Sequence, residues 1–356
     1  MKIIRLTTFL DFGGIESKMA NLSTLSDDNE WIFCAIGKGG TAEKKILSNN
    51  KLAVCFQLPH KIPSLKTIHK LYLYFKEQKP DVVHASGSEA NFHGVIAAKL
   101  AKIPVIIVEE IGIPNHTKMA KIIFSWIYKL SHYVVGESQT VVDHLKNNYK
   151  INSHKLKAVS NFALFPKIEA ANNNSKNDVF RLVSVSRLEP VKNSEGIIRV
   201  LHRLKKDKFK IEYTIVGDGS SKESILHLIE KLELQEEVHL VGFQNNTTDY
   251  YLQSDLYILN SLSEGFSNSL LEAMYLKKPS ITTNVGAAQE LILDGENGWI
   301  ISINNEDDLY EKIKQCYLLE PHLRTLMGEK AHQSVQKYSI EAHTKSLLAL
   351  YHQNYD

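Results

Sequence analysis

The sequence has few cysteines and no long apolar run. Its three cysteines are Cys34, Cys55 and Cys316, and their wide spacing matches neither a zinc site nor a disulfide framework. We therefore expect core thiols in a reducing compartment. The strongest apolar run is Val105–Val108, whereas a membrane-spanning helix needs about 18 to 20 apolar residues. The chain begins with a strand-like run and a turn rather than a secretory signal, so we expect a cytoplasmic protein.

The net charge of the whole chain is only +2, but positive and negative residues are unevenly distributed along it. Residues 1–163 carry 21 lysines and arginines against 13 acidic residues, a balance of +8, and residues 164–356 carry 21 against 27, a balance of −6. The basic part indicates an anionic partner. An anionic membrane surface, at the inner face of the cell membrane, and a phosphate-bearing acceptor fit this equally well. We expect no nucleic-acid partner, because no groove-reading helix motif or aromatic and basic platform is present.

The length of 356 residues suits two domains, and 43% hydrophobic with 23% charged residues is typical of a soluble globular protein. Over residues 1–163, short apolar runs alternate with helical patterns, which predicts a parallel sheet covered on both faces. The expected strands are Ile3–Thr8, Trp31–Ile36, Val54–Leu58, Val82–Ala85, Val105–Val108, Tyr133–Val135 and Lys157–Val159, and the expected helices include Ser64–Gln78, Ala90–Ala101 and Ser138–Asn147.

Residues 164–178 contain Pro166 and an asparagine-rich tract, which predict a linker. A second α/β series follows over residues 179–339, and the chain is helical from Glu306 to its end with a break near Tyr338–Ser339. We therefore predict an α/β fold of two Rossmann-like, doubly wound domains that face a central cleft. The strands expected in the second domain are Arg181–Val185, Ile211–Val216, Val238–Leu240, Leu256–Leu259, Ser280–Thr283 and Trp299–Ile301, with helices at Ser194–Lys206, Ser221–Leu232 and Ser269–Tyr275.

The segment from Ser263 to Ala273 follows a predicted strand and opens a predicted helix. Free N–H groups at such a helix start, together with the helix dipole, bind anions. Asn268 and Ser269 add side-chain donors there, Glu264 is placed to accept from sugar hydroxyls, and Glu272 from a ribose. A capped helix with two solvated glutamates is an equally good interpretation of this segment taken alone.

Two cations and two glycine turns follow other predicted strands. Arg187 and Lys192 lie after Arg181–Val185, where fixed positive charge would stabilise a departing diphosphate. Gly13-Gly14 after the first strand allows close approach to a phosphate or sugar. Gly217-Asp218-Gly219 is a common turn and lacks the remaining features of a dinucleotide fingerprint. Each of these features alone is more often a surface charge or a tight turn.

Taken in order, these segments resemble retaining glycosyltransferase family 4, which has the GT-B fold and includes bacterial enzymes of cell-surface glycans. The most specific feature is the pair Glu264 and Glu272, separated by seven residues, combined with the Arg-Leu…Lys-Asn segment. The resemblance covers nearly the whole chain. The segments that carry it are Gly13-Gly14-Ile15-Glu16, Asp81-Val82-Val83-His84, Ser186-Arg187-Leu188 with Lys192-Asn193, Val216-Gly217-Asp218-Gly219, Val241-Gly242-Phe243 and Glu264 to Glu272.

The resemblance implies a role for each matching residue. Arg187 and Lys192 correspond to the pair that holds the donor diphosphate, Glu264 faces the donor sugar, and Glu272 binds the ribose. It also implies that residues 340–356 form a helix that packs back on the first domain. The remaining donor-binding residues implied by the matching segments are Gly14, Gly242, Phe243, Phe266, Ser267, Asn268, Ser269 and Leu270.

Two departures from the family pattern affect the first domain. Ile111 stands where the family often has a histidine close to the donor sugar, and either Glu110 or His116 is a candidate to replace it, although a structural role for both is as good an interpretation. The segment His84-Ala85-Ser86 replaces a frequent His-x-His, so contacts to the acceptor are expected to differ.

The resemblance implies transfer of a hexose or N-acetylhexosamine from a nucleotide sugar, a UDP-sugar by expectation, to a glycan or lipid-linked acceptor with retention. No Asp-x-Asp occurs in the chain, so we expect no metal, and no cofactor is expected either. The leaving phosphate would then deprotonate the acceptor hydroxyl on the same face. Alternatives are a phosphorylase, an epimerase, or a nucleotide-sugar-binding protein with altered catalysis.

Overall fold

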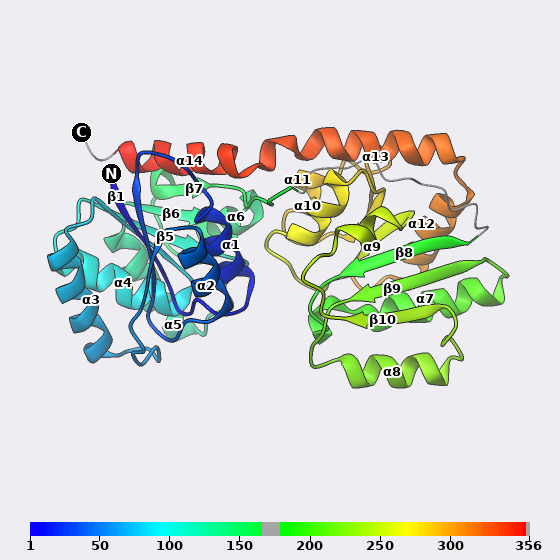
Figure 1. Cartoon of the computed structure of the whole chain (residues 1–356), viewed down its shortest axis with the longest axis horizontal. Helices are drawn as coiled ribbons and strands as arrows, with labels where there is room; N and C mark the ends of the chain where they lie inside the picture. Colours follow the sequence, from blue (N-terminus) through cyan, green and yellow to red (C-terminus); the bar gives the residue numbers. More distant parts are fainter. Residues whose placement is uncertain (166–178, 354–356) are drawn as a thin grey trace. The chain divides into compact units, whose positions relative to one another are not determined.

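The computed structural model describes residues 1–165 and 179–353, which form two α/β units (Figure 1). The N-terminal unit joins Met1–Phe162 to the chain from Ile340 onward, and the C-terminal unit spans Ala163–Ser339. Most of the expected linker, residues 166–178, lies outside the described residues. In the described part, no helix combines the length and the apolar character that crossing a membrane requires.

The N-terminal unit is built on a parallel seven-stranded sheet in the order β3-β2-β1-β4-β5-β6-β7. Successive strands are added on one side of β1 and then, from β4, on the other, so the order reverses between β1 and β4. The strands are β1 (Lys2–Thr7), β2 (Glu30–Ala35), β3 (Leu52–Cys55), β4 (Val82–Ser86), β5 (Val105–Glu110), β6 (Tyr133–Gly136) and β7 (Leu156–Ala158).

Helices cover both faces of this sheet (Figure 1). Several begin at residues that cap them: the side chains of Ser64, Thr117 and Ser138 each accept a hydrogen bond from the amide three residues on. The helices are α1 (Gly14–Leu22), α2 (Thr41–Ser48), α3 (Leu65–Gln78), α4 (Ser88–Leu100), α5 (Lys118–Leu130), α6 (Gln139–Asn148) and α14 (Ile340–His352).

Helix α14 returns from the far end of the chain to the N-terminal unit. Leu347, Leu350 and Tyr351 are buried in the same apolar cluster as Ile3 and Val105, which come from β1 and β5. Burial of such side chains is the main favourable contribution to packing. The last helix is therefore part of the N-terminal fold.

Two strands of this unit differ from their predicted ranges by more than one residue at an end. Strand β3 ends at Cys55, whereas the sequence predicted a strand up to Leu58, because Gln57 takes a left-handed conformation with φ of 53° that breaks the ladder. Strand β5 runs two residues beyond Val108 and includes Glu109 and Glu110. These carboxylates are held inside the unit by buried partners, which hydropathy alone does not reveal.

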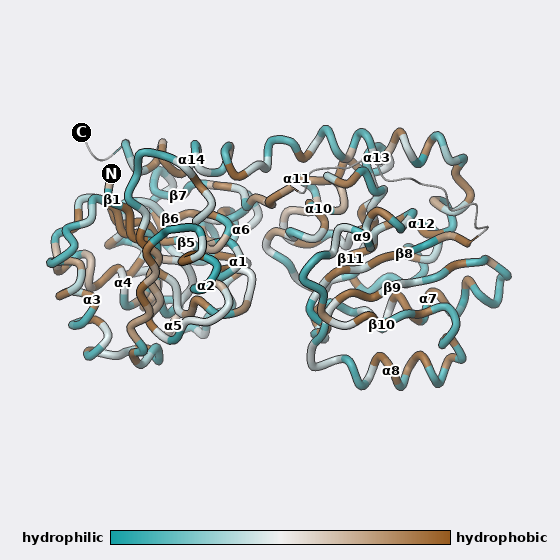
Figure 2. Tube along the Cα trace, viewed as in Figure 1, coloured by the Kyte–Doolittle hydropathy of each residue, from teal (hydrophilic) through white to brown (hydrophobic). Residues whose placement is uncertain are grey.

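The C-terminal unit has a parallel six-stranded sheet in the order β10-β9-β8-β11-β12-β13. Apolar residues follow its strands, as β8 and β9 show in Figure 2. The strand order reverses between β8 and β11. The strands are β8 (Phe180–Val185), β9 (Ile211–Val216), β10 (Val238–Gly242), β11 (Leu256–Leu259), β12 (Ser280–Thr283) and β13 (Trp299–Ile301).

Helices also cover this second sheet. Their predicted positions agree closely with the structure: α7 spans Ser194–Lys206 as expected, and α10 begins one residue before its predicted start. The helices are α7 (Ser194–Lys206), α8 (Lys222–Lys231), α9 (Thr248–Leu252), α10 (Asn268–Tyr275), α11 (Ala288–Leu291), α12 (Glu306–Leu318) and α13 (Pro321–Val335).

Candidate active site

Two loops of the C-terminal unit meet where its strand order reverses. One follows β8 and carries Arg187 and Lys192, and the other follows β11 and carries Glu264. Because neighbouring parallel strands end at the same edge of the sheet, the loops that follow β8 and β11 lie side by side. In open α/β sheets this point is where ligands bind.

Hydrogen bonds join the two loops directly. The amide of Leu262 donates to the carbonyl of Val191 at 2.7 Å, and the Asn260 side chain donates to the carbonyl of Asn193 at 3.1 Å. Asn193 takes a left-handed conformation with φ of 48°, which turns the chain into α7. Lys192 is thereby fixed beside the loop that follows β11.

Lys192 and Glu264 form an ion pair between these loops. The Lys192 ammonium donates to Glu264 Oε1, and the Ser261 hydroxyl donates to the same oxygen at 2.7 Å. The two charged side chains are only 17% and 14% exposed. A lysine ammonium has three donors, so Lys192 keeps hydrogens for an incoming anion while it holds Glu264.

Helix α10 begins at the end of the second loop. The Ser267 hydroxyl caps it by accepting from the amide of Leu270 at 3.3 Å, and Tyr257 donates to the Ser269 hydroxyl at 2.8 Å. The helix start thus combines first-turn amides with ordered hydroxyls. A small hollow that opens to solvent adjoins it and is lined by Leu259, Glu264, Ser267, Leu270, Thr282, Val285, Ala287, Ala288 and Leu291.

Glu272 lies one turn into α10. The Tyr251 hydroxyl donates to Glu272 Oε2 at 3.1 Å. Burial raises the pKa of Glu272 to about 7, and the hydrogen bond from Tyr251 counteracts this only in part. A carboxyl group in this state gains from further hydrogen-bond donors, which would favour its ionised form.

Arg187 is exposed on a loop whose backbone packs against the glycine turn that follows β9. Gly217 has φ of +142°, and a Cβ there would lie 1.8 Å from the carbonyl oxygen of Ser186. The amide of Leu188 donates to the carbonyl of Asp218 at 2.9 Å, which ties the two segments together. The glycine turn, which the sequence marks only as a common motif, thus shapes the backbone that carries Arg187.

The other predicted donor-binding residues of this unit differ in how far they are exposed. Phe243 is exposed by 54% at the end of β10, directly after Gly242. Phe266 is buried with its ring against Tyr338 at 5.4 Å between centroids, and the side chain of Leu270 is buried too. Asn268 is the first residue of α10.

The predicted residues of the N-terminal unit lie at separate places. Helix α1 begins at Gly14, where an added Cβ would meet nothing within 4 Å. Glu110 is 4% exposed and accepts hydrogen bonds from Asn91 at 2.8 Å and Tyr128 at 2.9 Å. Burial raises its pKa to about 7. A carboxyl group enclosed in this way cannot reach a donor sugar without repacking.

His116 is also held by its neighbours. Its Nδ1 lies 2.9 Å from the Tyr149 hydroxyl, and its ring stacks on Phe124 with 4.2 Å between the centroids. Burial, together with the positive charge of Lys121, lowers its pKa. Glu110 and His116 are therefore each held by contacts within the N-terminal unit, and these contacts do not join the two residues to each other.

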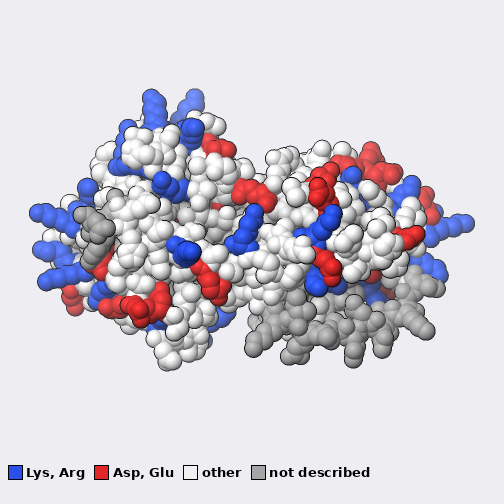
Figure 3. All heavy atoms as spheres, turned by 90° about the horizontal axis from the view of Figure 1, so that it is seen from above, with Lys and Arg blue, Asp and Glu red and all other residues white. Residues whose placement is uncertain are grey.

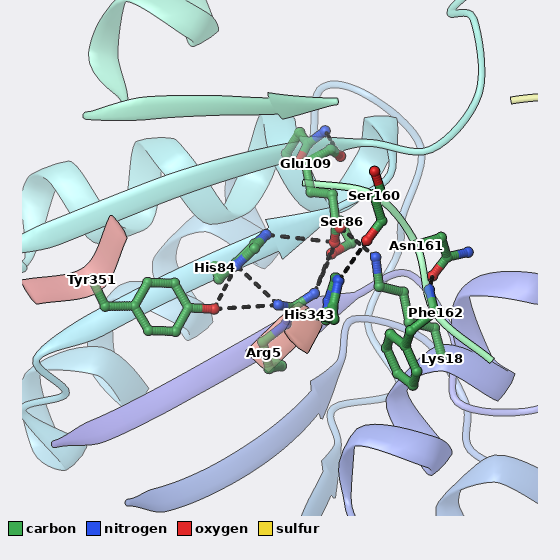
Figure 4. A network of polar contacts seen from close by, with 11 residues as sticks. Arg5, Lys18, His84, Ser86, Glu109, Ser160, Asn161, Phe162, His343 and Tyr351 are labelled. Atoms are coloured by element: carbon green, nitrogen blue, oxygen red, sulfur yellow. Dashed lines mark hydrogen bonds and ion pairs between the residues drawn. The ribbon is translucent and has the colours of Figure 1, made fainter. Parts of the chain in front are cut away.

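A buried polar network in the N-terminal unit was not predicted from the sequence. Its centre is Glu109, which accepts from Arg5 at 2.8 Å, from Lys18 at 2.6 Å and from the Ser86 hydroxyl at 2.6 Å (Figure 4). All four side chains are buried. Burial acts to raise the pKa of Glu109, but the charges of Lys18 and Arg5 outweigh it and hold that pKa well below its usual range.

His84 and Tyr351 connect the network to α14 (Figure 4). His84 Nδ1 lies 2.9 Å from Arg5 Nη1 and 2.7 Å from the Tyr351 hydroxyl. Because an arginine only donates, Nδ1 is an acceptor and the proton of the neutral ring lies on Nε2, which faces Glu109 Oε2 at 3.5 Å. Burial, then the charge of Arg5, lowers the pKa of His84 to about 4, so the ring is neutral at pH 7.

A signal for the network exists in the sequence, but it is incomplete. Arg5 follows the apolar residues Ile3 and Ile4 in β1, Glu109 follows the apolar run Val105–Val108 in β5, and a charge in such a buried strand implies a buried partner. The partners come from distant segments such as α1 and α14, so the sequence does not identify them. Among the described residues, no group of three or more histidine, cysteine, aspartate or glutamate side chains is arranged to hold a metal ion.

Two family profiles match the chain. Residues 167–334 match the family described as Glycosyl transferases group 1, and residues 27–163 match Glycosyltransferase Family 4. With two doubly wound units, these matches define an enzyme that transfers sugar from a nucleotide-sugar donor. The chain belongs to the family 4 type of glycosyltransferases, with the GT-B fold.

Curated relatives and solved structures agree with this assignment. An uncharacterized glycosyltransferase of Methanocaldococcus jannaschii is 29% identical over 316 residues, which is 81% of this chain and 74% of that protein. The N-acetylgalactosamine-N,N'-diacetylbacillosaminyl-diphospho-undecaprenol 4-alpha-N-acetylgalactosaminyltransferase of Campylobacter jejuni is 27% identical over 290 residues, 77% of this chain and 78% of that protein. Anabaena HepE in complex with UDP has the same fold, with a TM-score of 0.85 at 18% identity over 99% of this chain and 100% of that one.

Proposed function

We propose that the chain transfers a hexose or N-acetylhexosamine from a UDP-sugar to a hydroxyl group of a glycan or lipid-linked acceptor, with retention of the anomeric configuration. The observation that carries the proposal is the ion pair of Lys192 and Glu264 beside the start of α10, at the strand-order reversal of the C-terminal unit. Cation, carboxylate and helix amides together match the charges of a nucleotide sugar.

Each part of the donor has a matching group in this arrangement. Lys192 and the amides at the start of α10 would bind the diphosphate, with the exposed Arg187 as a second cation. Glu264 would accept hydrogen bonds from hydroxyl groups of the donor sugar. Glu272, with its partner Tyr251, would accept from the two hydroxyls of the ribose.

The chemical step follows from where charge develops. As the bond between the anomeric carbon and the phosphate oxygen breaks, negative charge grows on the leaving diphosphate, and fixed cations with helix amides stabilise it. We propose that these protein groups do this without a metal ion. The acceptor oxygen forms the new bond on the same face, and its proton passes to the leaving phosphate.

The contacts that Glu264 makes in the structure support transfer of the sugar on the same face, without a protein nucleophile. Its Oε1 accepts from both Lys192 and Ser261, and a carboxylate bound in this way is a weakened nucleophile. No covalent intermediate on the protein is therefore proposed. Positioning of the two substrates and stabilisation of the leaving group supply the rate.

The acceptor and location are proposed from the relatives and the charge of the chain. The Campylobacter jejuni enzyme is named for a diphospho-undecaprenol acceptor, and a Staphylococcus aureus relative is a capsular polysaccharide biosynthesis glycosyltransferase. We therefore propose a cytoplasmic enzyme of bacterial-type polysaccharide, capsule or lipopolysaccharide assembly that works at the inner face of the cell membrane. The balance of +8 over residues 1–163 suits that location.

Product analysis tests the proposal. The purified chain is incubated in EDTA with a panel of nucleotide sugars and with lipid-linked and soluble glycan acceptors, and the products are analysed by mass spectrometry and proton NMR. We expect a glycoside with the anomeric configuration of the donor. An inverted product, an epimerised donor, a sugar phosphate, or bound nucleotide sugar without turnover would each contradict it.

A further inference from the structure

Helix α5 has two apolar faces, of which only one packs against the protein. Phe124, Ile127 and Tyr128 are buried in the core of the N-terminal unit. Helical spacing alone predicts that Ile127 shares one apolar side with Ile122, Ile123 and Trp126, whereas in the structure Ile127 is buried. The outward residues are Met119, Ile122, Ile123 and Trp126, exposed by 74%, 73%, 37% and 54%.

The outward residues form one continuous stripe. Their spacing of three, four and seven residues from Met119 places them on one side of an α-helix, over two consecutive turns. Single exposed apolar side chains are common on protein surfaces, but a contiguous apolar group of this kind marks an interaction site. We call Met119, Ile122, Ile123 and Trp126 the α5 stripe.

Basic side chains flank the α5 stripe. Helix α5 contains no acidic residue, and its Lys118 and Lys129 are exposed. Lys121 lies toward α6, where its ammonium donates to the Asn148 side chain at 3.3 Å. The stripe is thus bordered by positive charge from its own helix.

More lysines lie around the C-terminal end of α5. Lys155 donates to the carbonyls of Lys129 at 2.9 Å and Ser131 at 2.7 Å, which brings its positive charge to the end of the helix. Burial lowers the pKa of Lys155, and so does the charge of Lys99, which is near enough to act on it. Figure 3, which views the molecule from above, shows basic side chains projecting from the N-terminal unit, with acidic side chains among them.

Helix α6 next to α5 contributes charge of the same sign. Its exposed Lys146 and the following Lys150 are basic, while Asp143, the acidic residue of this helix, accepts from the Gln139 side chain at 2.9 Å. An apolar stripe rimmed by lysines complements a surface that is apolar inside and anionic at its edge. An anionic lipid bilayer has that composition.

We propose that the α5 stripe is the membrane-docking surface of this protein, with Ile122 and Trp126 inserted at the headgroup level of anionic lipid and Lys118 and Lys129 among the headgroups. A tryptophan is suited to this depth, because its ring is apolar and its N–H is polar. The docking itself rests only on α5 and its neighbours. Its purpose, the capture of a lipid-linked acceptor, rests on the proposed function.

The tryptophans of the chain allow a direct measurement. Trp126 is 54% exposed, whereas Trp31 and Trp299 are 2% and 1% exposed. Fluorescence of the whole protein is therefore sensitive to lipid through Trp126. We expect vesicles of equal phosphatidylglycerol and phosphatidylcholine to shift its emission to shorter wavelength, brominated lipid to quench it, and pure phosphatidylcholine vesicles to have less effect.

Co-sedimentation with the same vesicles measures binding of the full chain and of three double variants. The Ile122→Ser/Trp126→Ser variant is expected to bind at least about tenfold more weakly. A Leu47→Ser/Leu65→Ser variant removes two exposed apolar side chains from α2 and α3 of the same unit and is expected to bind like the wild type. Lys118→Gln/Lys129→Gln should weaken binding and reduce its dependence on salt.

Several results would overturn the proposal. Equal binding by wild type and the Ile122→Ser/Trp126→Ser variant would exclude the α5 stripe, as would a lack of wild-type binding to anionic vesicles. Concentration-dependent dimers that this variant abolishes, without vesicle binding, would show that a second copy covers the stripe. Because fluorescence and sedimentation need no turnover, a failure of the proposed transferase activity is distinguishable from a failure of docking.

Discussion

Two glutamates separated by seven residues have different surroundings in this protein. Glu264 is in an ion pair with Lys192, whereas Glu272 has a tyrosine hydroxyl as its partner and a pKa that burial raises to about 7. An ionised carboxylate beside a cation and a carboxyl group near its titration point respond differently to a ligand. The sequence motif therefore identifies the two carboxyl groups, but only their surroundings show that they differ in charge partner and in burial.

The raised pKa of Glu272 predicts a pH-dependent affinity for UDP. Ribose hydroxyls that donate to Glu272 favour its ionised form, so binding releases a proton when the pH is below about 7. We expect the dissociation constant to fall as the pH rises from 5.5 to 8, by as much as about tenfold per pH unit below the titration point. Calorimetry in buffers of different ionisation enthalpy measures the proton release.

Glu272→Gln is the control for this measurement, because it cannot ionise but keeps an acceptor for Tyr251. The diphosphate of UDP titrates near pH 6 as well, and this contribution is the same in both proteins. The pH dependence that remains in the variant is therefore due to the ligand. Identical pH profiles for wild type and variant would show that Glu272 does not bind the ribose.

Removal of the Lys192 ammonium is expected to reduce turnover. Lys192→Ala takes away a diphosphate cation and leaves Glu264 without its partner, so we expect kcat/KM to fall at least about tenfold, which corresponds to about 1.4 kcal/mol. Lys206→Ala, an exposed lysine of α7 in the same unit, is the matched control. Unchanged steady-state kinetics of Lys192→Ala with a UDP-sugar would contradict this role.

The positions of the candidate site residues could be predicted from the sequence in more detail for the C-terminal unit than for the N-terminal unit. Lys192, Glu264 and Glu272 lie on segments with their own local patterns, since each follows a strand or begins a helix. The buried partners of Glu110 and Glu109 come from other elements. Their positions depend on tertiary packing, which no local pattern encodes.

Strand β5 shows why the pKa values of two adjacent carboxyl groups shift in opposite directions. Successive side chains of a strand point to opposite faces, so Glu109 faces Arg5 and Lys18 while Glu110 faces Asn91 and Tyr128. The cations hold the pKa of Glu109 well below its usual range, and burial raises that of Glu110 to about 7.

This difference predicts how Glu110→Gln changes stability. The pKa of Glu110 is about 7 in the folded protein and near 4.5 when unperturbed, so the folded state keeps a proton that the unfolded chain loses between these values. The stability that Glu110 contributes below pH 4.5 is lost as the pH rises to about 7. Glutamine does not ionise, so the variant should become the more stable protein at pH 8, by on the order of 1 to 3 kcal/mol.

Urea denaturation of both proteins between pH 5 and pH 8 measures this difference. Glu341→Gln, on the exposed side of α14, is the matched control, for which a much smaller change is expected. A free-energy difference between wild type and Glu110→Gln that does not change with pH would contradict the prediction.

The arrangement of elements could be predicted because apolar strands and helical patterns alternate regularly. The errors fall where a local conformation or a buried charge overrides hydropathy, as at Gln57 after β3 and at Glu109 in β5. The two faces of α5 were separated only by the structure, since both carry large apolar residues. Periodicity identifies that a helix is amphipathic but not which of two apolar faces packs inward.

At the scale of the whole chain, the last helix is needed to complete the first unit. Tyr351 of α14 reaches Arg5 and His84 in the buried network, across nearly the full length of the sequence. Such contacts make the stability of the N-terminal unit depend on the C-terminal end of the chain. They also explain why the network has no local signature.

Tyr351→Phe tests this connection. The substitution removes a hydroxyl 2.7 Å from His84 Nδ1 and is expected to lower the free energy of unfolding by about 1 to 3 kcal/mol, because the lost partner is buried. Tyr133→Phe removes a hydroxyl that bonds Gln353 of the same terminal region at 3.0 Å but at the exposed surface, and about 0.5 kcal/mol or less is expected. Equal effects in urea denaturation would contradict a buried network that anchors α14.

We propose that Arg187 and Lys192 of the C-terminal unit hold the donor diphosphate without a metal ion. Calorimetric titration of UDP into the wild type and into an Arg187→Ala/Lys192→Ala variant, both in EDTA, tests it most directly. We expect the wild type to bind one UDP per chain in EDTA and the variant to bind at least about a hundredfold more weakly, which corresponds to two losses of about 1.4 kcal/mol. Equal affinities, or wild-type binding that appears only when Mg²⁺ or Mn²⁺ is added, would contradict it.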